Sequence, residues 1–257
     1  MTYLHALILS IVEGITEFLP ISSTGHMVLV AHFLRIDQTE FVKTFEIFIQ
    51  LGAILAAIVL YARRILTNWK LFKQLVIAFI PTGIIGLTVY KLVKQFLLGN
   101  AIVTTIALLI GGLVLIAFDL LWREPRHATT IEKITIPQSI SIGFFQTLAM
   151  IPGVSRSAAT IIGGSLAGLS REAAVEFSFM LAIPTMLAAS GLDLIKSSHH
   201  FSSSEFQILT VGFFGAFLSA LIVIKIFIGL LSRRTFLWFG LYRVILALAI
   251  LGFGLLK

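Results

Sequence analysis

Two short stretches carry most of the chemically reactive side chains of this sequence. Residues 13–26, EGITEFLPISSTGH, combine two glutamates, three successive hydroxyl side chains and a histidine. Residues 152–160, PGVSRSAAT, place Arg156 between two serines. Carboxylates, hydroxyls and a guanidinium are the groups that hold cations and phosphates and transfer protons. We expect the two stretches to meet inside the molecule and to form one anion-binding site.

The first stretch contains a pair of carboxylates at helical spacing. Glu13 and Glu17 are four residues apart, which places them on one face of a helix. Two such buried charges disfavour each other, so they need a shared proton or a cation between them. Oxygen ligands suit a hard divalent cation, Mg²⁺ or Ca²⁺, and we predict one on this pair. The alternative is two structural glutamates at a packed helix interface.

Hydroxyl residues follow at the point where a second short helix should begin. Ser22, Ser23 and Thr24 precede Gly25, and hydroxyls at a helix start cap free backbone N–H groups. A helix start also attracts phosphate, so Ser22, Thr24 and Gly25 are predicted to bind a phosphate group. Ser23 is the first candidate for a nucleophile, and a metal-activated water is the alternative.

Two residues are candidates for the group that takes the proton from Ser23. Glu17 lies six residues before it, and His26 lies three residues after it. A lone histidine in an apolar chain is more often an ordinary buried residue, but its place in this cluster favours a role as acid, base or phosphate donor.

The second stretch is predicted to grip an anion. A guanidinium in an apolar region is expensive, does not deprotonate and presents a fork that fits phosphate oxygens. Ser155 and Ser157 flank Arg156 and repeat the helix-cap pattern, so all three residues are predicted to bind the anion. The alternative for Arg156 is a structural salt bridge to a glutamate.

Other polar residues of the apolar segments carry weaker signals. One group lies near the expected site and either orients it or makes ordinary hydrogen bonds between helices: Glu46, Gln50, Glu176 and Ser178. A second group lies close enough to segment ends to reach the membrane surface: Asp119, Asp193, Lys225 and Arg243.

The composition is that of a membrane protein. The 257 residues are 58% hydrophobic and only 12% charged, about half of the usual charged fraction of ~25%, and the mean hydropathy is +1.03. The absence of cysteine excludes disulfides and thiolate metal sites. The net charge of +7 is explained by basic loops that contact anionic lipid, so we expect membrane lipids and not nucleic acid as partners.

The apolar segments form an all-α polytopic pattern. Two pairs of segments fall short of the ~20 residues needed to cross a bilayer, and each is typical of a re-entrant helical hairpin whose broken tip is enclosed by protein. The pairs are residues 4–19 with 24–34 and residues 138–151 with 157–169. Six segments are predicted to be transmembrane helices: residues 45–62, 75–90, 101–121, 174–195, 208–231 and 236–256.

The same order of segments occurs twice within one membrane domain, residues 1–257. The two units cover approximately residues 1–122 and 137–257, and a shift of 132 positions aligns Pro20 with Pro152 and Ser23 with Ser155. Three spans are an odd number, so the second unit must enter from the opposite face. We therefore predict an inverted-topology repeat whose broken segments meet near the midplane.

Charge orients the chain in the membrane. Ten Lys and Arg residues fall on one predicted side and six on the other, which makes the first side cytoplasmic. The first side holds Arg63, Arg64, Lys70, Lys73, Arg123, Arg126, Lys133, Arg171, Arg233 and Arg234. The other side holds Arg35, Lys43, Lys91, Lys94, Lys196 and Lys257.

These residues resemble a known family. EGITEFLPISSTGH and PGVSRSAAT, with KTFEIFIQLGAI at residues 43–54 and EFSFMLAIP at residues 176–184, are similar to the undecaprenyl-diphosphate phosphatases of bacterial membranes, the type linked to bacitracin resistance. The resemblance covers essentially the whole chain. It implies six spans and two re-entrant hairpins in an inverted repeat, a divalent cation and a homodimer.

The resemblance also implies a reaction. Undecaprenyl diphosphate would be hydrolysed to undecaprenyl phosphate and inorganic phosphate at the outer, periplasmic face of the cytoplasmic membrane, which recycles the lipid carrier for peptidoglycan and other wall polymers. By motif match the acidic pair of the family falls on Glu13 and Glu17, its Ser/His element on Ser23 and His26, and its phosphate-binding arginine on Arg156.

Two other classes of function remain open from the residues alone. Inverted repeats with broken helices and midplane charges are typical of secondary transporters and would also suit a lipid flippase. A scaffold for wall-synthesis enzymes is a weaker alternative, because buried charges in a membrane are expensive and usually functional.

Overall fold

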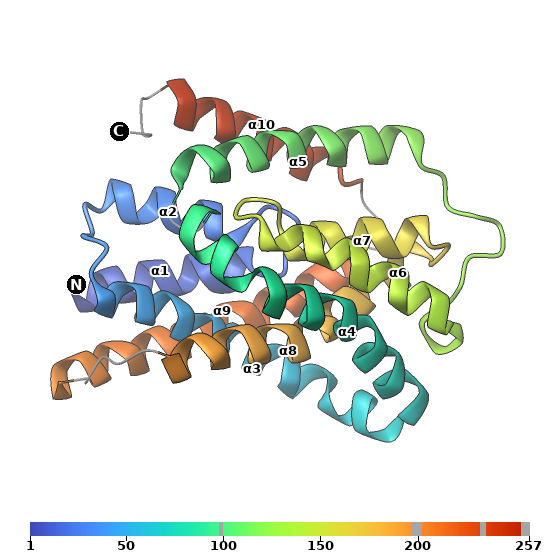
Figure 1. The fold of residues 1–257 in the computed structure, drawn as a ribbon, viewed down its shortest axis with the longest axis horizontal. Coiled ribbons are helices and arrows are strands. Elements are labelled where there is room, and N and C mark those ends of the chain that lie inside the picture. The colour runs from blue at the N-terminus through green and yellow to red at the C-terminus, as the bar shows by residue number, and fades with distance from the viewer. Residues whose placement is uncertain (98–99, 197–201, 232–234, 253–257) are drawn as a thin grey trace.

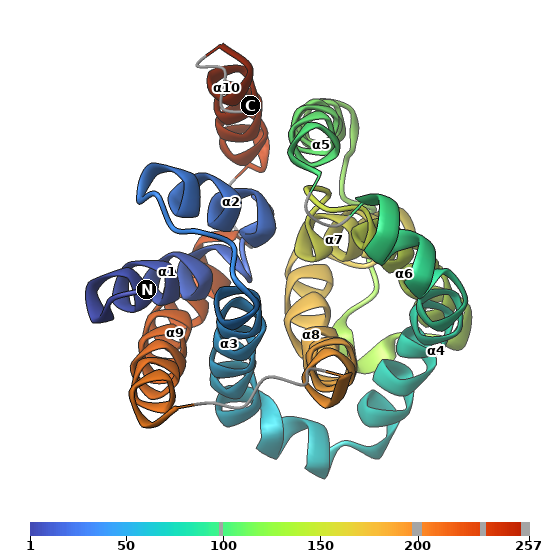
Figure 2. The ribbon, with the colours of Figure 1, turned by 60° about the vertical axis from the view of Figure 1, so that its left-hand side comes forward.

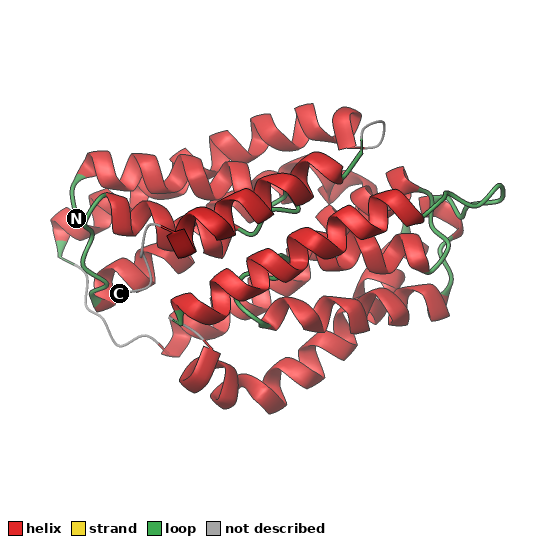
Figure 3. Ribbon diagram, turned by 90° about the horizontal axis from the view of Figure 1, so that it is seen from above, coloured by secondary structure: helices red, strands yellow, loops and turns green. Residues whose placement is uncertain are grey.

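The protein is a bundle of helices, seen in a computed structural model that describes residues 1–97, 100–196, 202–231 and 235–252. Within these ranges the regular structure is helical, with one isolated parallel bridge between Thr129 and Leu169 (Figure 3). The α-helices are α1 (Tyr3–Thr16), α2 (Ser23–Phe33), α3 (Glu40–Thr67), α4 (Trp69–Leu92), α5 (Ala101–Leu121), α6 (Ile136–Thr147), α7 (Arg156–Leu166), α8 (Arg171–Lys196), α9 (Ser203–Leu231) and α10 (Leu237–Gly252). A π-helix (Val93–Leu97) and two 3₁₀ turns (Ile131–Lys133 and Leu148–Met150) complete the described elements.

The two predicted hairpins are present as pairs of short helices. Figure 1 shows that α1 and α2 open toward the end of the bundle where the chain begins, and that α6 and α7 open toward the opposite end. Their connecting turns lie in the middle of the molecule. Both pairs match the expected segments to within a few residues.

Among the described residues, five helices are long and apolar enough to cross a membrane: α3, α4, α5, α8 and α9. The chain is therefore a multi-pass helical membrane protein. The sixth predicted span, residues 236–256, contains α10, which has 16 described residues and ends at Gly252. Residues 253–256 of that predicted segment lie outside the described part of the chain.

The halves of the chain interlock rather than lie side by side. Helix α1 of the first half packs on α9 of the second, and α6 of the second half packs on α4 of the first. Figure 2 shows α3 and α8 side by side between these two groups, with α5 and α10 together at one edge.

Glycines allow the closest of these helix contacts. A Cβ on Gly14 of α1 would meet Ser219 and the backbone of Ala216 in α9, and one on Gly143 of α6 would meet the backbone of Ala78 and the ring of Pro81 in α4. Lipid is as apolar as the side chains themselves, so packing between membrane helices depends on such close approach of small residues.

The end of the bundle that carries most of the basic residues is tied by ion pairs. Arg64 contacts both carboxylate oxygens of Glu176 at 3.1 and 3.0 Å and Glu132 at 2.8 Å. Arg171 lies 3.2 Å from Asp119 and stacks on the rings of Trp122 and Phe236. Glu176 therefore serves this end of the bundle and not the expected anion site.

Replacement of Gly52 by alanine is expected to destabilise the protein. A Cβ at this position of α3 would meet the carbonyl group of Phe213 in α9, and overpacking of this kind costs ~1–3 kcal/mol. The matched control is Gly191→Ala in α8, where a Cβ meets nothing within 4 Å and alanine gains ~0.5–1 kcal/mol in a helix. Thermal unfolding in one detergent should move the two melting temperatures in opposite directions; a fall of equal size in both would contradict the packing of α3 on α9.

Candidate active site

The two central half-helices begin with the same unusual cap. Ser22 precedes α2 with φ 71° and ψ 98°, and Ser155 precedes α7 with φ 74° and ψ 116°. Positive φ is uncommon for a residue with a Cβ, and such strain gathers at functional sites. Each Oγ accepts the backbone N–H three residues later, from Gly25 at 3.4 Å and from Ala158 at 3.3 Å. Each half-helix start therefore carries its partial positive charge at the centre of the molecule.

The caps make Ser23 and Arg156 structurally equivalent. Each is the first helical residue after its cap serine. The offset between them is 133 positions, one more than the shift of 132 that aligns the prolines in the sequence. The residue equivalent to Ser155 is thus Ser22, and the serine predicted as nucleophile has an arginine as its counterpart.

The tips of the two hairpins touch. The Ser157 hydroxyl donates to the Leu19 carbonyl at 2.7 Å, and Ser155 Oγ lies 3.5 Å from the same oxygen. Arg156 Nη2 lies 3.3 Å from Glu17 Oε1, and both side chains are buried. The prediction that the two polar stretches meet is confirmed.

Glu17 connects the two candidate groups that handle phosphate. One of its carboxylate oxygens contacts Arg156, and the other accepts a 2.7 Å hydrogen bond from the Ser23 hydroxyl. Glu17 follows the last residue of α1, and its own N–H donates to the Glu13 carbonyl at 2.9 Å. A carboxylate that already holds the serine proton in a hydrogen bond has the geometry of a general base.

His26 is bound elsewhere. Its Nδ1 lies 2.8 Å from the Ser22 carbonyl, and its Nε2 lies 2.7 Å from the Tyr242 hydroxyl of α10. A carbonyl only accepts, so Nδ1 carries the proton and Nε2 of a neutral ring accepts from Tyr242. Both ring nitrogens are therefore engaged away from Ser23, and of the two predicted bases Glu17 is the one in contact with it.

Arg156 keeps one guanidinium nitrogen without a hydrogen-bond partner. Its Nη1 donates to the Ser178 carbonyl at 2.9 Å, Nη2 approaches Glu17, and the guanidinium lies 5.8 Å from the centre of the Phe18 ring. Its Nε is buried and has no hydrogen-bond partner. An unpaired donor on a buried cation is costly, and a bound anion oxygen would satisfy it.

Glu13 and Glu17, the pair predicted to bind a metal ion, have only some of their carboxylate oxygens in hydrogen bonds. Glu13 is buried one helical turn before Glu17, and its Oε1 has no hydrogen-bond partner. In the described part of the chain no group of three or more His, Cys, Asp or Glu side chains could hold a metal ion. The pair fits a hard cation as a two-carboxylate site whose other ligands would be phosphate, hydroxyl or water oxygens.

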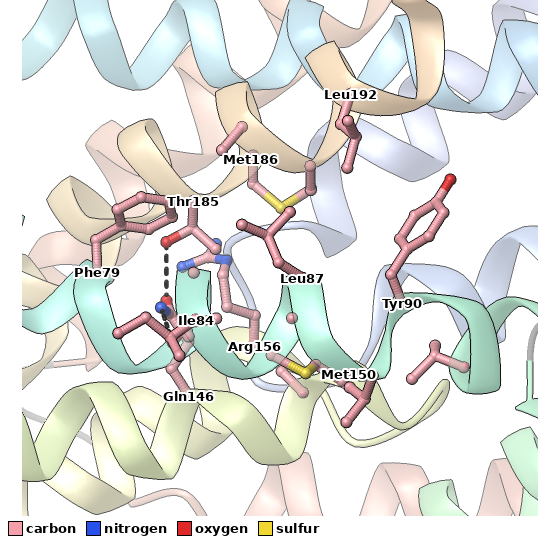
Figure 4. A pocket seen from close by; sticks show the side chains of 18 of the residues that line it. Phe79, Ile84, Leu87, Tyr90, Gln146, Met150, Arg156, Thr185, Met186 and Leu192 are labelled. Atoms are coloured by element: carbon pink, nitrogen blue, oxygen red, sulfur yellow. Dashed lines mark hydrogen bonds between the residues drawn. The ribbon is translucent and has the colours of Figure 1, made fainter. Parts of the chain in front are cut away.

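A polar and an apolar cavity adjoin at Arg156. The polar one, about 140 Å³, is lined by Glu17, Ser22, Ser23, Thr24, Gln50, Ala149, Ile151, Pro152, Gly153, Ser155, Arg156 and Met186. The apolar one, about 570 Å³, lies between α4, α8 and the end of α6. Figure 4 shows Arg156 among the side chains that line the larger cavity. Ala149, Arg156 and Met186 line both cavities, so the two spaces are neighbours.

Comparison with known proteins identifies the family. The sequence profile of the family described as Bacitracin resistance protein BacA matches residues 6–249. The chain belongs to the BacA family. It is 50% identical over 255 residues to a protein of Aquifex aeolicus named undecaprenyl-diphosphatase, covering 99% of this chain and 100% of that one. Proteins with the same name from Persephonella marina and Wolinella succinogenes are 48% and 47% identical, with coverage of 99% and 98% of this chain and 100% and 98% of theirs.

The predicted site residues of this BacA family member divide into two groups. Glu17, Ser22, Ser23, Thr24, Ser155 and Arg156 line the polar cavity. Glu13, Gly25, His26 and Ser157 lie behind it, outside its lining. A Cβ at Gly25 would meet the Leu108 side chain of α5, so packing already accounts for this glycine.

Among the weaker candidates, two reach the site and two do not. Gln50 lines the polar cavity and accepts from Ser190 at 3.2 Å, and the Ser178 carbonyl holds Arg156. Glu46 does not line the polar cavity and accepts a hydrogen bond from Gln38 at 3.3 Å near the start of α3, and Glu176 pairs with Arg64. A hydropathy pattern does not separate these cases, because it does not tell which face of a span meets the hairpin tips.

The prediction that Arg243 reaches the membrane surface is wrong. Its side chain is fully buried beside the hairpin tips. Together with Tyr242, which binds His26, it is a residue near the site that sequence reasoning missed. Its position seven residues after the start of the predicted span at 236 gave no sign that the hairpin tips come this close.

Replacement of Ser157 by alanine is expected to loosen the contact between the tips. It removes the hydrogen bond to the Leu19 carbonyl and leaves that oxygen with only the long contact from Ser155, a loss of ~1–2 kcal/mol. Ser165→Ala on the same helix is the control, because Ser165 Oγ is buried without a partner and its removal should be neutral or stabilising. Melting temperatures compared in one detergent test the pair; a stability of Ser157→Ala equal to that of Ser165→Ala would contradict a tip-to-tip bond.

Proposed function

We propose that this protein hydrolyses undecaprenyl diphosphate to undecaprenyl phosphate and inorganic phosphate. The observation that carries the proposal is the contact of Ser23, Glu17 and Arg156 at the meeting point of two helix starts. These are the groups that a phosphatase needs, a nucleophile, a base and an anion clamp. The names of the BacA relatives support the substrate. The reaction would return the lipid carrier to peptidoglycan synthesis and would confer bacitracin resistance.

The proposed setting is the bacterial cytoplasmic membrane, crossed by six helices. In this arrangement α10 is the sixth span, and the two hairpins are re-entrant, one from each side, as their opposite directions in Figure 1 suggest. The chain is then an inverted repeat with units of about residues 1–122 and 137–257. More basic residues are predicted on the side that holds Arg64 and Arg171, which supports a cytoplasmic position for that end and a site open to the outer, periplasmic side.

The diphosphate is held by positive ends and donors from both hairpins. The starts of α2 and α7 supply partial positive charge, and the cap hydroxyls of Ser22 and Ser155 line the same cavity. Arg156 turns its unpaired Nε and part of its fork to the phosphate oxygens. Phosphoryl transfer depends mainly on such positioning and charge stabilisation.

The chemical step begins at Ser23. Its Oγ attacks the terminal phosphorus while its proton passes to Glu17 Oε2, 2.7 Å away. The bond from that phosphorus to the bridging oxygen breaks, and undecaprenyl phosphate leaves with both electrons of the bond. Water then cleaves the phosphoserine and releases inorganic phosphate. The proton held by Glu17 returns to the Ser23 oxygen. His26, bound to Ser22 and Tyr242, holds the cap of α2 in place in this scheme.

Glu13 and Glu17 are the proposed ligands of a divalent cation, Mg²⁺ or Ca²⁺. When bound, such a cation offsets the charge of the phosphate groups. The free Oε1 of Glu13 is the observation that supports the assignment. Glu17 would share its carboxylate between the cation, Ser23 and Arg156.

The isoprenoid tail lies in the apolar cavity between α4 and α8. This cavity lies beside the polar one at Arg156, so a substrate with a charged head and an oily tail would place its head in one and the start of its tail in the other. Ile84, Leu87 and Met186 are among its apolar walls (Figure 4). A pocket of this kind, mostly apolar with a few placed polar groups, is typical of ligand sites.

Ser23→Ala is expected to lower phosphate release from undecaprenyl diphosphate about a thousand-fold or more, since both the nucleophile and its bond to Glu17 are lost. Ser165→Ala, a buried serine away from both cavities, should retain full turnover and controls for handling of the protein. A phosphoserine trapped on wild-type protein by acid quench and located by mass spectrometry would identify Ser23 as the nucleophile. Full turnover by Ser23→Ala would remove Ser23 from that role.

EDTA is expected to abolish phosphate release, and added Mg²⁺ or Ca²⁺ to restore it. Glu13→Gln keeps the Ser23–Glu17 bond but weakens the cation site, so the Mg²⁺ concentration for half-maximal activity should rise by about tenfold or more. The comparison variant is Glu132→Gln, whose carboxylate binds Arg64 instead and whose Mg²⁺ dependence should match wild type. Turnover that is unaffected by EDTA would contradict the cation.

A further inference from the structure

Arg243 is a buried guanidinium held only by backbone carbonyls. Its five N–H groups make five hydrogen bonds, which uses the full donor set of an arginine. Nε donates to Leu108 at 3.3 Å; Nη1 donates to Pro20 at 3.3 Å and Val154 at 3.0 Å; Nη2 donates to Ala107 at 3.2 Å and Gly153 at 2.8 Å. In the described part of the chain it forms no ion pair.

The five acceptors come from three separate segments. Ala107 and Leu108 belong to α5, Pro20 to the tip of the first hairpin, and Gly153 and Val154 to the tip of the second. Nη1 alone bridges the two tips, since it donates to Pro20 and to Val154. One planar group therefore fixes both tips relative to each other and to α5.

The site of the proposed phosphatase depends on that relation. Ser23 and Glu17 belong to the first hairpin and Arg156 to the second, and these residues come together only if the tips keep their register. The other described side-chain contacts between the tips are few: the Ser155 and Ser157 hydroxyls on Leu19, and the Arg156 guanidinium on Glu17 and on the Phe18 ring. The hydrogen bonds from the guanidinium also fix the orientation of the peptide planes whose carbonyls accept them, near the two helix starts.

Two neighbouring features indicate that the structure is built around this contact. Tyr242, the preceding residue of α10, binds His26 at 2.7 Å, so two successive residues of one helix reach the tips. Gly111 of α5 leaves the space that the guanidinium occupies, because a Cβ there would meet Arg243 Nη2 and Cζ. Figure 2 shows α10 alongside α5 and next to α2, at the edge of the bundle.

We propose that Arg243 is a positioning residue that locks the two hairpin tips in the register required for phosphoryl transfer. The proposal rests on the proposed phosphatase function. Arg243 touches no substrate in this scheme and acts through the backbone of Pro20, Gly153 and Val154.

The test compares purified Arg243→Lys, Arg243→Met and Gly111→Ala with wild type, by phosphate release from undecaprenyl diphosphate in detergent. Lysine keeps the charge but has at most three donors and no planar fork. Misplacement of reacting groups by about 1 Å costs roughly a hundred-fold in rate, so Arg243→Met should lose about that factor, mainly in kcat. Arg243→Lys and Gly111→Ala should each lose roughly tenfold or more, the latter by displacing an intact guanidinium.

The matched control is Arg171→Met. Arg171 is also a partly buried arginine that connects helices, but it lies at the basic end of the bundle, on Asp119 and two aromatic rings. It should lower the melting temperature while kcat, measured below that temperature, stays within about twofold of wild type. A kcat loss in Arg171→Met equal to that in Arg243→Met would mean that any buried arginine matters equally, and it would overturn the specific role.

Hydrogen exchange gives a readout that does not depend on activity. Peptides covering residues 17–26 and 150–158 should exchange faster in Arg243→Lys and Gly111→Ala than in wild type, and peptides of α9 should not change. Guanidinium chloride at millimolar concentration should restore part of the activity of Arg243→Ala and should not raise the activity of wild type. Unchanged exchange at both tips in Arg243→Lys and Gly111→Ala would overturn the proposal.

The two proposals fail in different ways. Wild-type protein that releases no phosphate from undecaprenyl diphosphate would refute the phosphatase function, and the exchange experiment would still decide whether Arg243 holds the tips. An active wild type together with fully active Arg243→Lys and Gly111→Ala would refute the role of Arg243 alone.

Discussion

The structure depends on satisfying backbone groups where two helices stop in the middle of an apolar bundle. Within lipid no water reaches such groups, and each one left unpaired is costly. At the first tip the Leu19 and Pro20 carbonyls are bound by Ser157 and Arg243, and at the second tip Gly153 and Val154 are bound by Arg243. The helix starts at the same tips bring their partial positive charge next to the polar cavity that Ser22, Ser23, Ser155 and Arg156 line.

The charges at the centre follow from the same requirement. Arg243 has no carboxylate partner in the described chain and is stabilised by carbonyl dipoles, whereas Arg156 shares Glu17 with Ser23. Two buried arginines and two buried glutamates thus stand within one small region. The attraction between two buried opposite charges offsets the cost of their desolvation only with good geometry and further hydrogen bonds. Here Ser178, Ser23 and the ring of Phe18 supply those contacts.

The sequence predicts much of this arrangement because its signals are local. Short apolar pairs interrupted by proline and serine predict hairpins, long apolar runs predict spans, and a guanidinium in an oily stretch predicts an anionic partner, either a phosphate or a glutamate. The failures concern contacts over long separations. The His26–Tyr242 bond joins residues 216 apart, and the Arg243 bond to Pro20 joins residues 223 apart. No periodicity within α10 reveals that this face meets two hairpin tips, so proximity to a segment end was the only available guide and it misled.

The sequence pattern also did not predict the correct register between the two halves. A shift of 132 aligns the prolines, but the cap geometry pairs Ser22 with Ser155, because the chain turns one residue later in the second hairpin. This difference of one residue changes which side chains occupy equivalent positions in the two halves. Two similar backbones, each with a serine held at positive φ, present different side chains at the first helical position, a hydroxyl in Ser23 and a guanidinium in Arg156.

A site built from two equivalent helix starts has room for both roles of a phosphoryl-transfer site, attack and charge stabilisation, without further elements. The division works only while the starts face one cavity, and that is a property of the tips and not of either half alone. The apolar cavity beside Arg156 adds a wall of apolar side chains next to the polar cavity. A ligand with a charged head and an apolar tail would match this neighbouring pair, whereas a water-soluble diphosphate would leave the larger space without an apolar occupant.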